Sequence, residues 1–177
     1  EQAKTKADIV VHENKNNLME EIFRGMRTNL QFMLKENEKV IAFTSTTSGE
    51  GKTFIAANLA VSFALLGRKV ILVGLDIRKP RLAELFEIKD HHHGITRLLT
   101  HSHSTQEEIK AQILPSGVNE RLDLLMSGPI PPNPSELLAR ESLDHIIDNL
   151  KEMYDYIIID TAPVGLVTDT LQVSRII

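Results

Sequence analysis

One stretch of the sequence combines glycine, hydroxyl and lysine residues in the order that phosphate binding requires. Residues 44–53 end in Gly51-Lys52-Thr53, which matches the end of the P-loop pattern, whereas Thr46 replaces the glycine that opens it. The two glycines before Lys52 let the backbone aim N–H groups at phosphate oxygens, and a helix that begins there adds its N-terminal dipole. Lys52 can reach the β- and γ-phosphates, and the Thr53 hydroxyl can bind Mg²⁺. The predicted nucleotide site consists of Ser48, Gly49, Glu50, Gly51, Lys52, Thr53 and Phe54.

Two carboxylates further along the chain fall at the ends of apolar segments. Asp160 follows Tyr156–Ile159, and Asp76 lies just beyond Val70–Val73. The carboxyl ends of parallel strands form the ligand-binding edge of an open sheet, so we expect Asp160 to help hold Mg²⁺ there. We expect Asp76 to reach the same edge and Arg78 to lie within reach of the phosphates. Each of the three segments also has a simpler interpretation: the P-loop segment as a Ser/Gly-rich turn, Asp160 as a strand-ending aspartate and Asp76 as a helix cap. Because the three segments occur together, we favour the functional interpretation of each.

The apolar pattern predicts helices and strands in alternation around these residues. Apolar positions recur at helical spacing from Leu18 to about Lys35 (Leu18, Ile22, Met26, Leu30 and Met33 or Leu34), and a second helix runs from Lys52 to Leu66, closed by Gly67. A third long helix is expected around Ile146 to Leu150. The expected strands are Val40–Phe43, Val70–Val73, Leu122–Met126 and Tyr156–Ile159. Apolar strands separated by helices are typical of a doubly wound, mostly parallel α/β sheet covered on both faces.

Length and composition favour one globular domain, or most of a larger one. The chain has 177 residues, of which we interpret 1–17 as a linker or N-terminal arm and 18–177 as the P-loop domain, with a truncated C-terminus expected because no strand follows the last helical stretch. A net charge of −4 argues against a broad basic face for nucleic acid, and the absence of cysteine excludes disulfides and thiolate metal sites. No apolar run has the length of a membrane span, so we expect any membrane link to come through a partner or through chain outside this sequence.

These motifs together resemble those of the bacterial tyrosine kinases, the P-loop autokinases of capsule and exopolysaccharide export. The resemblance extends from about Leu18 to Ile177. Gly51-Lys52-Thr53 is similar to the end of the family's Walker A motif, and Asp160 to its Walker B aspartate. Asp76-Ile77-Arg78-Lys79-Pro80 looks like the extra Walker A′ motif that marks the family.

Two further segments are similar to the family. Gly128 to Leu138 looks like its proline-rich loop and the helix that follows. Glu21, Arg24 and Arg27 match the Glu-x-x-Arg-x-x-Arg segment that is implicated in ring assembly. The resemblance therefore implies a homo-oligomer in which neighbouring subunits meet near this first helix.

The resemblance implies a fold, a reaction and a set of partners. The fold would be a P-loop NTPase of the deviant Walker A, partition-ATPase-like type, binding ATP with Mg²⁺ and transferring the γ-phosphoryl group to tyrosine. Lys52 would neutralise developing charge, Thr53, Asp76 and Asp160 would hold Mg²⁺, Asp76 would also position or deprotonate the tyrosine, and Arg78 would support the phosphates. The acceptor would be the tyrosine-rich tail of a neighbouring subunit. A membrane adaptor, fused or separate, would place the domain in the cytoplasm at the inner face of the membrane.

Two departures from the family pattern affect this expectation. Gly74 stands where the Walker A′ motif has its first aspartate, so only Asp76 carries over. We expect Asp76, Asp160 and Thr53, with phosphate oxygens and water, to complete the Mg²⁺ shell without it. The chain also has no tyrosine-rich tail, because its only tyrosines, Tyr154 and Tyr156, lie beside a predicted core strand and are expected to be packing residues.

Two rival functions and one rival site remain at this point. The partition and septum-site ATPases carry a signature lysine five residues before the P-loop lysine, and this chain has Thr47 there. A nucleotide-binding regulator with weak catalysis is the other rival, suggested by Gly74. A cluster of histidines invites a metal hypothesis, but we expect a solvated loop because no carboxylate accompanies them at a fixed spacing: His91, His92, His93, His101 and His103.

Overall fold

Five short strands form a single sheet in the computed structural model, which describes residues 18–34, 38–43, 51–75, 82–89, 92–99, 104–129 and 141–161. Their order in the sheet is β1-β5-β2-β4-β3; the first four are parallel, and β3 is antiparallel to β4. The four predicted strands are confirmed, with every end within one residue of its expected position. The two-residue strand β3 was missed because it is too short to carry a periodic pattern. The bounds are Val40–Phe43 for β1, Val70–Gly74 for β2, Leu114–Pro115 for β3, Leu122–Leu125 for β4 and Tyr156–Asp160 for β5.

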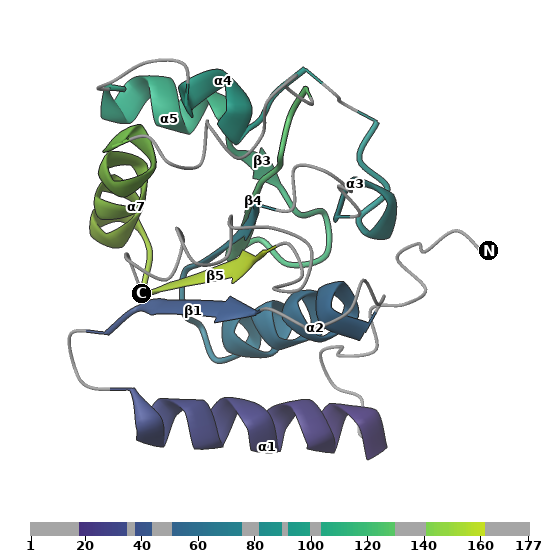
Figure 1. The fold of residues 1–177 in the computed structure, drawn as a ribbon. Helices are drawn as coiled ribbons and strands as arrows, with labels where there is room; N and C mark the ends of the chain where they lie inside the picture. The colour runs from purple at the N-terminus through teal and green to yellow at the C-terminus, as the bar shows by residue number, and fades with distance from the viewer. Residues whose placement is uncertain are drawn as a thin grey trace.

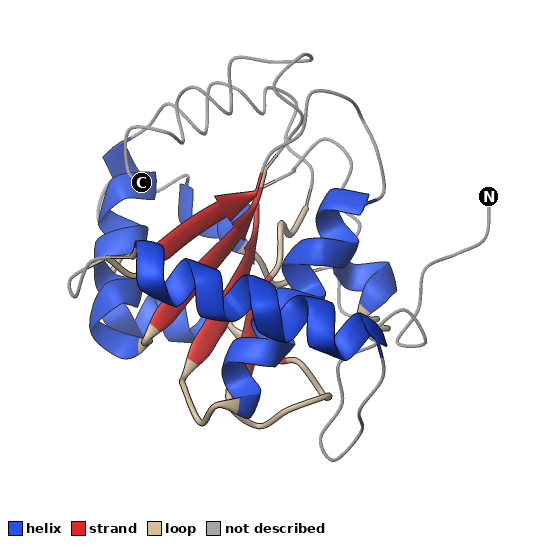
Figure 2. Cartoon of the chain, turned by 90° about the horizontal axis from the view of Figure 1, so that it is seen from below, coloured by secondary structure: helices blue, strands red, loops and turns tan. Residues whose placement is uncertain are grey.

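Helices cover both faces of this sheet, which gives the three layers seen in Figures 1 and 2. One face packs against α1 (Leu18–Met33), α2 (Gly51–Leu65) and α3 (Leu82–Leu85). The other face packs against α4 (Ile95–Leu99), α5 (Gln106–Gln112) and α7 (Glu141–Met153). Side chains alternate between the two faces along each strand, and this alternation divides the apolar core into two clusters. The doubly wound α/β architecture is confirmed, and no helix among the described residues is long and apolar enough to cross a membrane.

The first helix is attached to the domain through α2. The ring of Phe23 packs edge-on against Phe54, with the ring centroids 5.8 Å apart. Arg27 donates to the carbonyl and the hydroxyl oxygen of Ser62 at 3.0 and 3.2 Å. This contact buries part of the guanidinium, and burial together with the nearby charge of Arg24 lowers the pKa of Arg27. Arg27 therefore stabilises α1 against α2 within the same chain.

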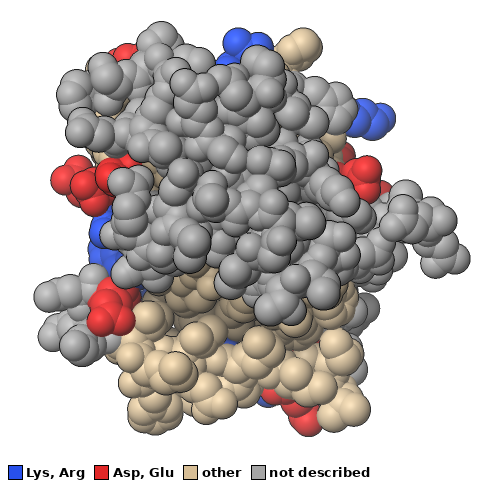
Figure 3. All heavy atoms as spheres, in the orientation of Figure 1, with Lys and Arg blue, Asp and Glu red and all other residues tan. Residues whose placement is uncertain are grey.

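The predicted buried face of α1 is only partly correct. Met26 and Leu30 pack inward as expected, but the most deeply buried residues of the helix are Glu20 and Phe23. The face of α1 that contacts α2 therefore differs from the face formed by the expected apolar positions, because Glu20 and Arg27 also lie on the inner side of the helix. Most of the exposed side chains of α1 are uncharged, and Figure 3 shows such residues over the lower part of the molecule, where α1 lies. The large apolar residues exposed there are Leu18, Met19, Ile22, Phe32 and Met33.

Both tyrosines are packing residues, as predicted. Tyr154 is 7% exposed, and its hydroxyl donates to Asp123 Oδ2 at 2.7 Å. Burial, together with this carboxylate, raises the pKa of Tyr154 well above its usual value. The ring of Tyr156 lies against Phe63, with the centroids 4.3 Å apart. Each tyrosine therefore ties β5 or the turn before it to neighbouring elements.

Two glycines allow the start of α4 to lie directly on the segment that follows β4. Ile95 N–H donates to the carbonyl of Met126 at 2.8 Å, and Thr96 N–H donates to that of Ser127 at 3.1 Å. At Gly94, a Cβ atom would lie 2.2 Å from the backbone nitrogen of Gly128 and 2.3 Å from its Cα. Gly128 itself has a φ of +80°, which disfavours any side chain. This approach fixes the backbone beside the carboxyl end of β2.

The close approach predicts opposite effects for two glycine-to-alanine substitutions. Gly94→Ala should lower the free energy of unfolding by about 1–3 kcal/mol, because the atoms it meets are backbone and cannot move aside alone. Gly25→Ala, in the middle of α1 with nothing within 4 Å of the added carbon, should raise it by about 0.5–1 kcal/mol. Urea denaturation of both variants measures the difference. A Gly94→Ala protein as stable as the wild type would contradict the described contact.

Candidate active site

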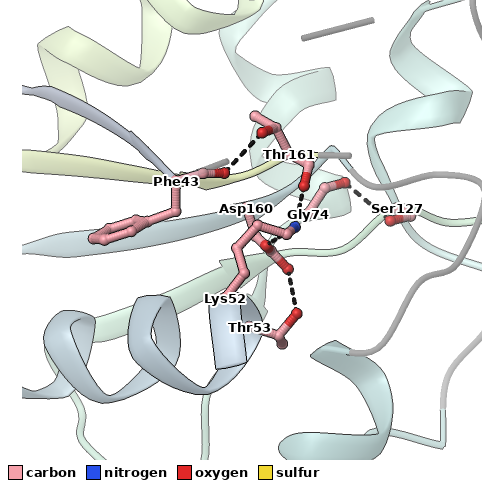
Figure 4. A network of polar contacts seen from close by, with 7 residues as sticks. All are labelled: Phe43, Lys52, Thr53, Gly74, Ser127, Asp160 and Thr161. Atoms are coloured by element: carbon pink, nitrogen blue, oxygen red, sulfur yellow. Dashed lines mark hydrogen bonds and ion pairs between the residues drawn. The ribbon is translucent and has the colours of Figure 1, made fainter. Parts of the chain in front are cut away.

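The carboxyl end of β5 meets the first turn of α2 in a cluster of polar contacts (Figure 4). Lys52 is the second residue of α2, and its Nζ forms an ion pair with Asp160 Oδ1. The same Nζ donates a hydrogen bond to the backbone carbonyl of Thr161. The lysine of the P-loop pattern and the aspartate at the end of the last strand therefore lie at the same edge of the sheet, as expected, and they are in direct contact.

Thr53 completes the contacts of the aspartate. Its Oγ1 donates to Asp160 Oδ2 at 3.0 Å, so each carboxylate oxygen has a different partner. A carboxylate and a hydroxyl side by side provide the hard oxygen ligands that Mg²⁺ prefers. Thr53 and Asp160 therefore fit a magnesium ion by the chemistry of their donor atoms.

The charges of this cluster lie in the interior of the protein. Only 5% of the Lys52 side chain and 3% of the Asp160 side chain are exposed. Two buried charges cost free energy through lost hydration, and the cost is offset only when they are paired and their other polar atoms are hydrogen-bonded. The contacts with Thr53 and Thr161 meet that requirement, so the charges stay concentrated at one point of the sheet edge.

Thr161 is a member of the cluster that the sequence analysis missed. Its carbonyl binds Lys52, while its Oγ1 donates to the carbonyl of Phe43 at 2.7 Å and its N–H donates to the same carbonyl at 3.1 Å. Thr161 thereby links the ends of β5 and β1. The available signal was its position directly after the strand-ending aspartate.

Gly74 lies beside Asp160, with which it is paired in the register of β2 and β5. A Cβ at this position would lie 3.2 Å from Ser127 Oγ and 3.2 Å from Leu82 Cδ1. The side chain of the family's missing aspartate would therefore start in a space that Ser127 and Leu82 already limit. Ser127, which follows β4, donates from its Oγ to the carbonyl of Gly74 at 2.9 Å, and it is the second site neighbour that the sequence analysis did not identify.

The structure describes only part of the predicted site. Gly51 begins α2 at an exposed position, and the Phe54 ring packs against α1, so any contact of Phe54 with nucleotide would come from its backbone. Within the described ranges no three His, Asp or Glu side chains are grouped to hold a metal, and His92 and His93 belong to those ranges. The predicted site residues that lie outside the described residues are Ser48, Gly49, Glu50, Asp76 and Arg78.

Several solved structures share this fold. The chimerical protein CapA2B2 matches with a TM-score of 0.85 and 38% identity, over 96% of this chain and 73% of that one. The kinase domain of the Escherichia coli tyrosine kinase ETK matches with a TM-score of 0.80 and 30% identity, over 89% and 60%. The septum site-determining protein MinD from Pyrococcus horikoshii, complexed with Mg-ADP, matches with a TM-score of 0.60 and 26% identity, over 76% and 52%.

A family model described as an AAA domain matches residues 38–174, which places the chain in a class of nucleotide-binding proteins. CapB of Staphylococcus aureus, named among the tyrosine-protein kinases, is 36% identical over 174 residues, or 98% of this chain and 74% of CapB. The tyrosine-protein kinase CpsD of Streptococcus agalactiae serotype III is 39% identical over 156 residues, or 88% of this chain and 65% of CpsD. The chain belongs to the bacterial tyrosine-protein kinase family, as the motifs in its sequence indicated.

The buried ion pair predicts strong coupling between its two members. Lys52→Met should lower the free energy of unfolding by about 3–5 kcal/mol, because it leaves the Asp160 carboxylate buried without its cation. Asp160→Asn should also destabilise, and the double variant should cost less than the sum of the two single changes. Chemical denaturation without added nucleotide completes this double-mutant cycle. Strictly additive effects would show that the two side chains do not depend on each other.

Proposed function

We propose that this domain binds ATP with Mg²⁺ and transfers the γ-phosphoryl group to tyrosine. The observation that carries the proposal is the cluster of Lys52, Thr53 and Asp160 at the junction of α2 and β5, in a chain that belongs to the tyrosine-kinase family. The chain spans about three quarters of CapB and about two thirds of CpsD, so the activity of the whole protein is part of the proposal.

The three residues have separate tasks in the proposed reaction. Lys52 binds the β- and γ-phosphates and neutralises the charge that develops on them. Thr53 and Asp160 would hold Mg²⁺, which would neutralise part of the negative charge of the phosphates. Binding therefore exchanges contacts that these side chains now make with one another for contacts with phosphate and metal. Asp76 and Arg78 are assigned by family resemblance, Asp76 as a further metal ligand and Arg78 as a support for the phosphates.

The chemical step moves a phosphoryl group between two oxygens. The tyrosine hydroxyl oxygen attacks the γ-phosphorus, and the bond between that phosphorus and the β–γ bridging oxygen breaks, which releases ADP. Asp76 positions the hydroxyl or accepts its proton. Tyr154 and Tyr156 are packed into the domain, so the acceptor is a tyrosine outside it, and we assign it to the tyrosine-rich tail of a neighbouring subunit.

The proposed partners follow from the family. A membrane adaptor, fused or separate, would hold the domain in the cytoplasm at the inner face of the membrane, and the process it serves is capsule or exopolysaccharide synthesis and export. A switch ATPase of the septum-site type is the rival function, and the likeness to MinD supports the shared fold. Thr47 in place of the signature lysine disfavours it.

Transfer of radiolabelled γ-phosphate to a peptide that carries several tyrosines tests the proposal. Lys52→Met should reduce the rate at saturating ATP and Mg²⁺ by about 10²-fold or more, because a desolvated charge on the phosphates is lost. Lys110→Met, which removes an exposed lysine of α5, is the matched control and should not change the rate. Asp76→Asn should abolish transfer while nucleotide binding persists.

Two results would overturn the assignment. Wild-type transfer by the Lys52→Met protein would show that the site lies elsewhere. Nucleotide hydrolysis by the wild type without any phosphotyrosine, under the same conditions, would favour the switch ATPase.

Self-association through α1 is a second part of the proposal. Glu21 and Arg24 are exposed on this helix, next to its outer apolar side chains, whereas Arg27 is bound to Ser62 of the same chain. We therefore assign the contact with a neighbouring subunit to Glu21 and Arg24, and we assign to Arg27 the orientation of the helix that presents them.

Light scattering on two charge reversals separates these roles. Arg24→Glu should reduce the mass of the oligomer, because it reverses an exposed charge that faces a neighbour. Arg27→Glu should lower the melting temperature, because it breaks the contact with Ser62 and places a carboxylate beside a carbonyl oxygen. An oligomer that keeps its mass in the Arg24→Glu protein would remove Arg24 from the interface.

A further inference from the structure

Hydrogen bonds run in a row across the carboxyl edge of the sheet, from Ser127 to Phe43, and Figure 4 labels the residues of this row except Leu75. Ser127 Oγ donates to the carbonyl of Gly74 at 2.9 Å. The N–H of Leu75, in the same peptide unit as that carbonyl, donates to the carbonyl of Asp160 at 2.9 Å. The N–H of Thr161, in the next peptide unit of the row, donates to the carbonyl of Phe43 at 3.1 Å. Two peptide units are thus held in series, with a serine hydroxyl at one end.

Ser127 extends this row beyond the backbone pairing of its own strand. The register between β2 and β4 ends with Val73 opposite Leu125, so the carbonyl of Gly74 has no partner in the ladder of β4. The hydroxyl of Ser127 supplies that partner. Ser127 is 5% exposed. Its carbonyl accepts from the N–H of Thr96 at 3.1 Å, and the carbonyl of the preceding Met126 accepts from the N–H of Ile95, so the backbone on each side of the hydroxyl is held by α4.

The far end of the row is the binding machinery itself. The peptide unit between Asp160 and Thr161 joins two residues that contact Lys52. The carboxylate of Asp160 binds Lys52 and Thr53, and the carbonyl of Thr161 also binds Lys52. A change in the tilt of this peptide unit would move both groups at once. Hydrogen bonds in series also polarise one another, so the loss of the first bond weakens the next.

We propose that Ser127 is a positioning residue of the site, which acts through the two peptide units of this row on the carboxylate of Asp160. The row also accounts for glycine at position 74, because a Cβ there would lie 3.2 Å from the Ser127 hydroxyl oxygen. The inference rests on the proposed function only for what Asp160 binds, which is the magnesium of a bound nucleotide. The hydrogen bonds of the row are part of the fold and do not depend on the proposed function.

Amide hydrogen exchange tests the row without any ligand. Ser127→Ala should speed exchange at the amides of Leu75 and Thr161 by about fivefold relative to the amides of Leu72 and Ile158 in the same strands, the factor expected for one ordinary hydrogen bond. Ser116→Ala is the matched control, because Ser116 is also buried and donates to the carbonyl of Asn119 at 3.0 Å, away from the site. Unchanged relative exchange in Ser127→Ala would overturn the proposal.

Magnesium binding tests the effect on Asp160. With a fluorescent ADP analogue bound, Ser127→Ala should need roughly tenfold more Mg²⁺ for the half-maximal signal, the lower end of the loss seen when an outer hydrogen-bond partner of a metal site is removed. Ser116→Ala should need no more than the wild type, even where it is equally destabilised. Equal Mg²⁺ requirements for Ser127→Ala and wild type would overturn the positioning role. A wild type that binds no nucleotide would instead refute the proposed function, and the exchange result would still decide whether the row exists.

Discussion

A lysine and an aspartate buried against each other impose the requirements that organise this domain. Two charges with so little exposure cost free energy unless they are paired and hydrogen-bonded, and their partners come from two places in the chain. Thr53 lies next to the lysine, Thr161 next to the aspartate, and the two charges are 108 residues apart in sequence. The pairing of β5 with both β1 and β2 is what brings them together.

Backbone hydrogen bonds connect the ion pair to the neighbouring strands. The end of β5 is held on one side by Phe43 and on the other by the peptide after Gly74, which is held in turn by Ser127. Ser127 can reach that carbonyl because the segment after β4 is fixed by α4, and α4 approaches so closely because Gly94 has no side chain. Gly94 is therefore connected to the ion pair through one close backbone packing contact and a series of hydrogen bonds.

Patterns that depend on neighbours in sequence predicted most of this architecture. Apolar runs marked four strands, and the P-loop spacing together with a strand-ending aspartate brought Lys52, Thr53 and Asp160 to one edge before the fold was known. Ser127 and Thr161 were missed because their roles arise from contacts with backbone carbonyls, which any residue supplies and no spacing reveals. The inner face of α1 was partly wrong for a related reason, since Arg27 finds its partner on α2 and draws a polar side chain inward.

The strand order also sets a sequence of events for the folding chain. β5 comes last of the five strands along the chain but lies between β1 and β2, which do not pair with each other. A chain that emerges from the ribosome carries its N-terminal strands with their central edges unpaired until residue 160 has been added, and such edges are open to pairing with other chains. Contacts of long sequence separation also form slowly. The edge that carries the candidate site is therefore among the last parts of the newly made domain to form.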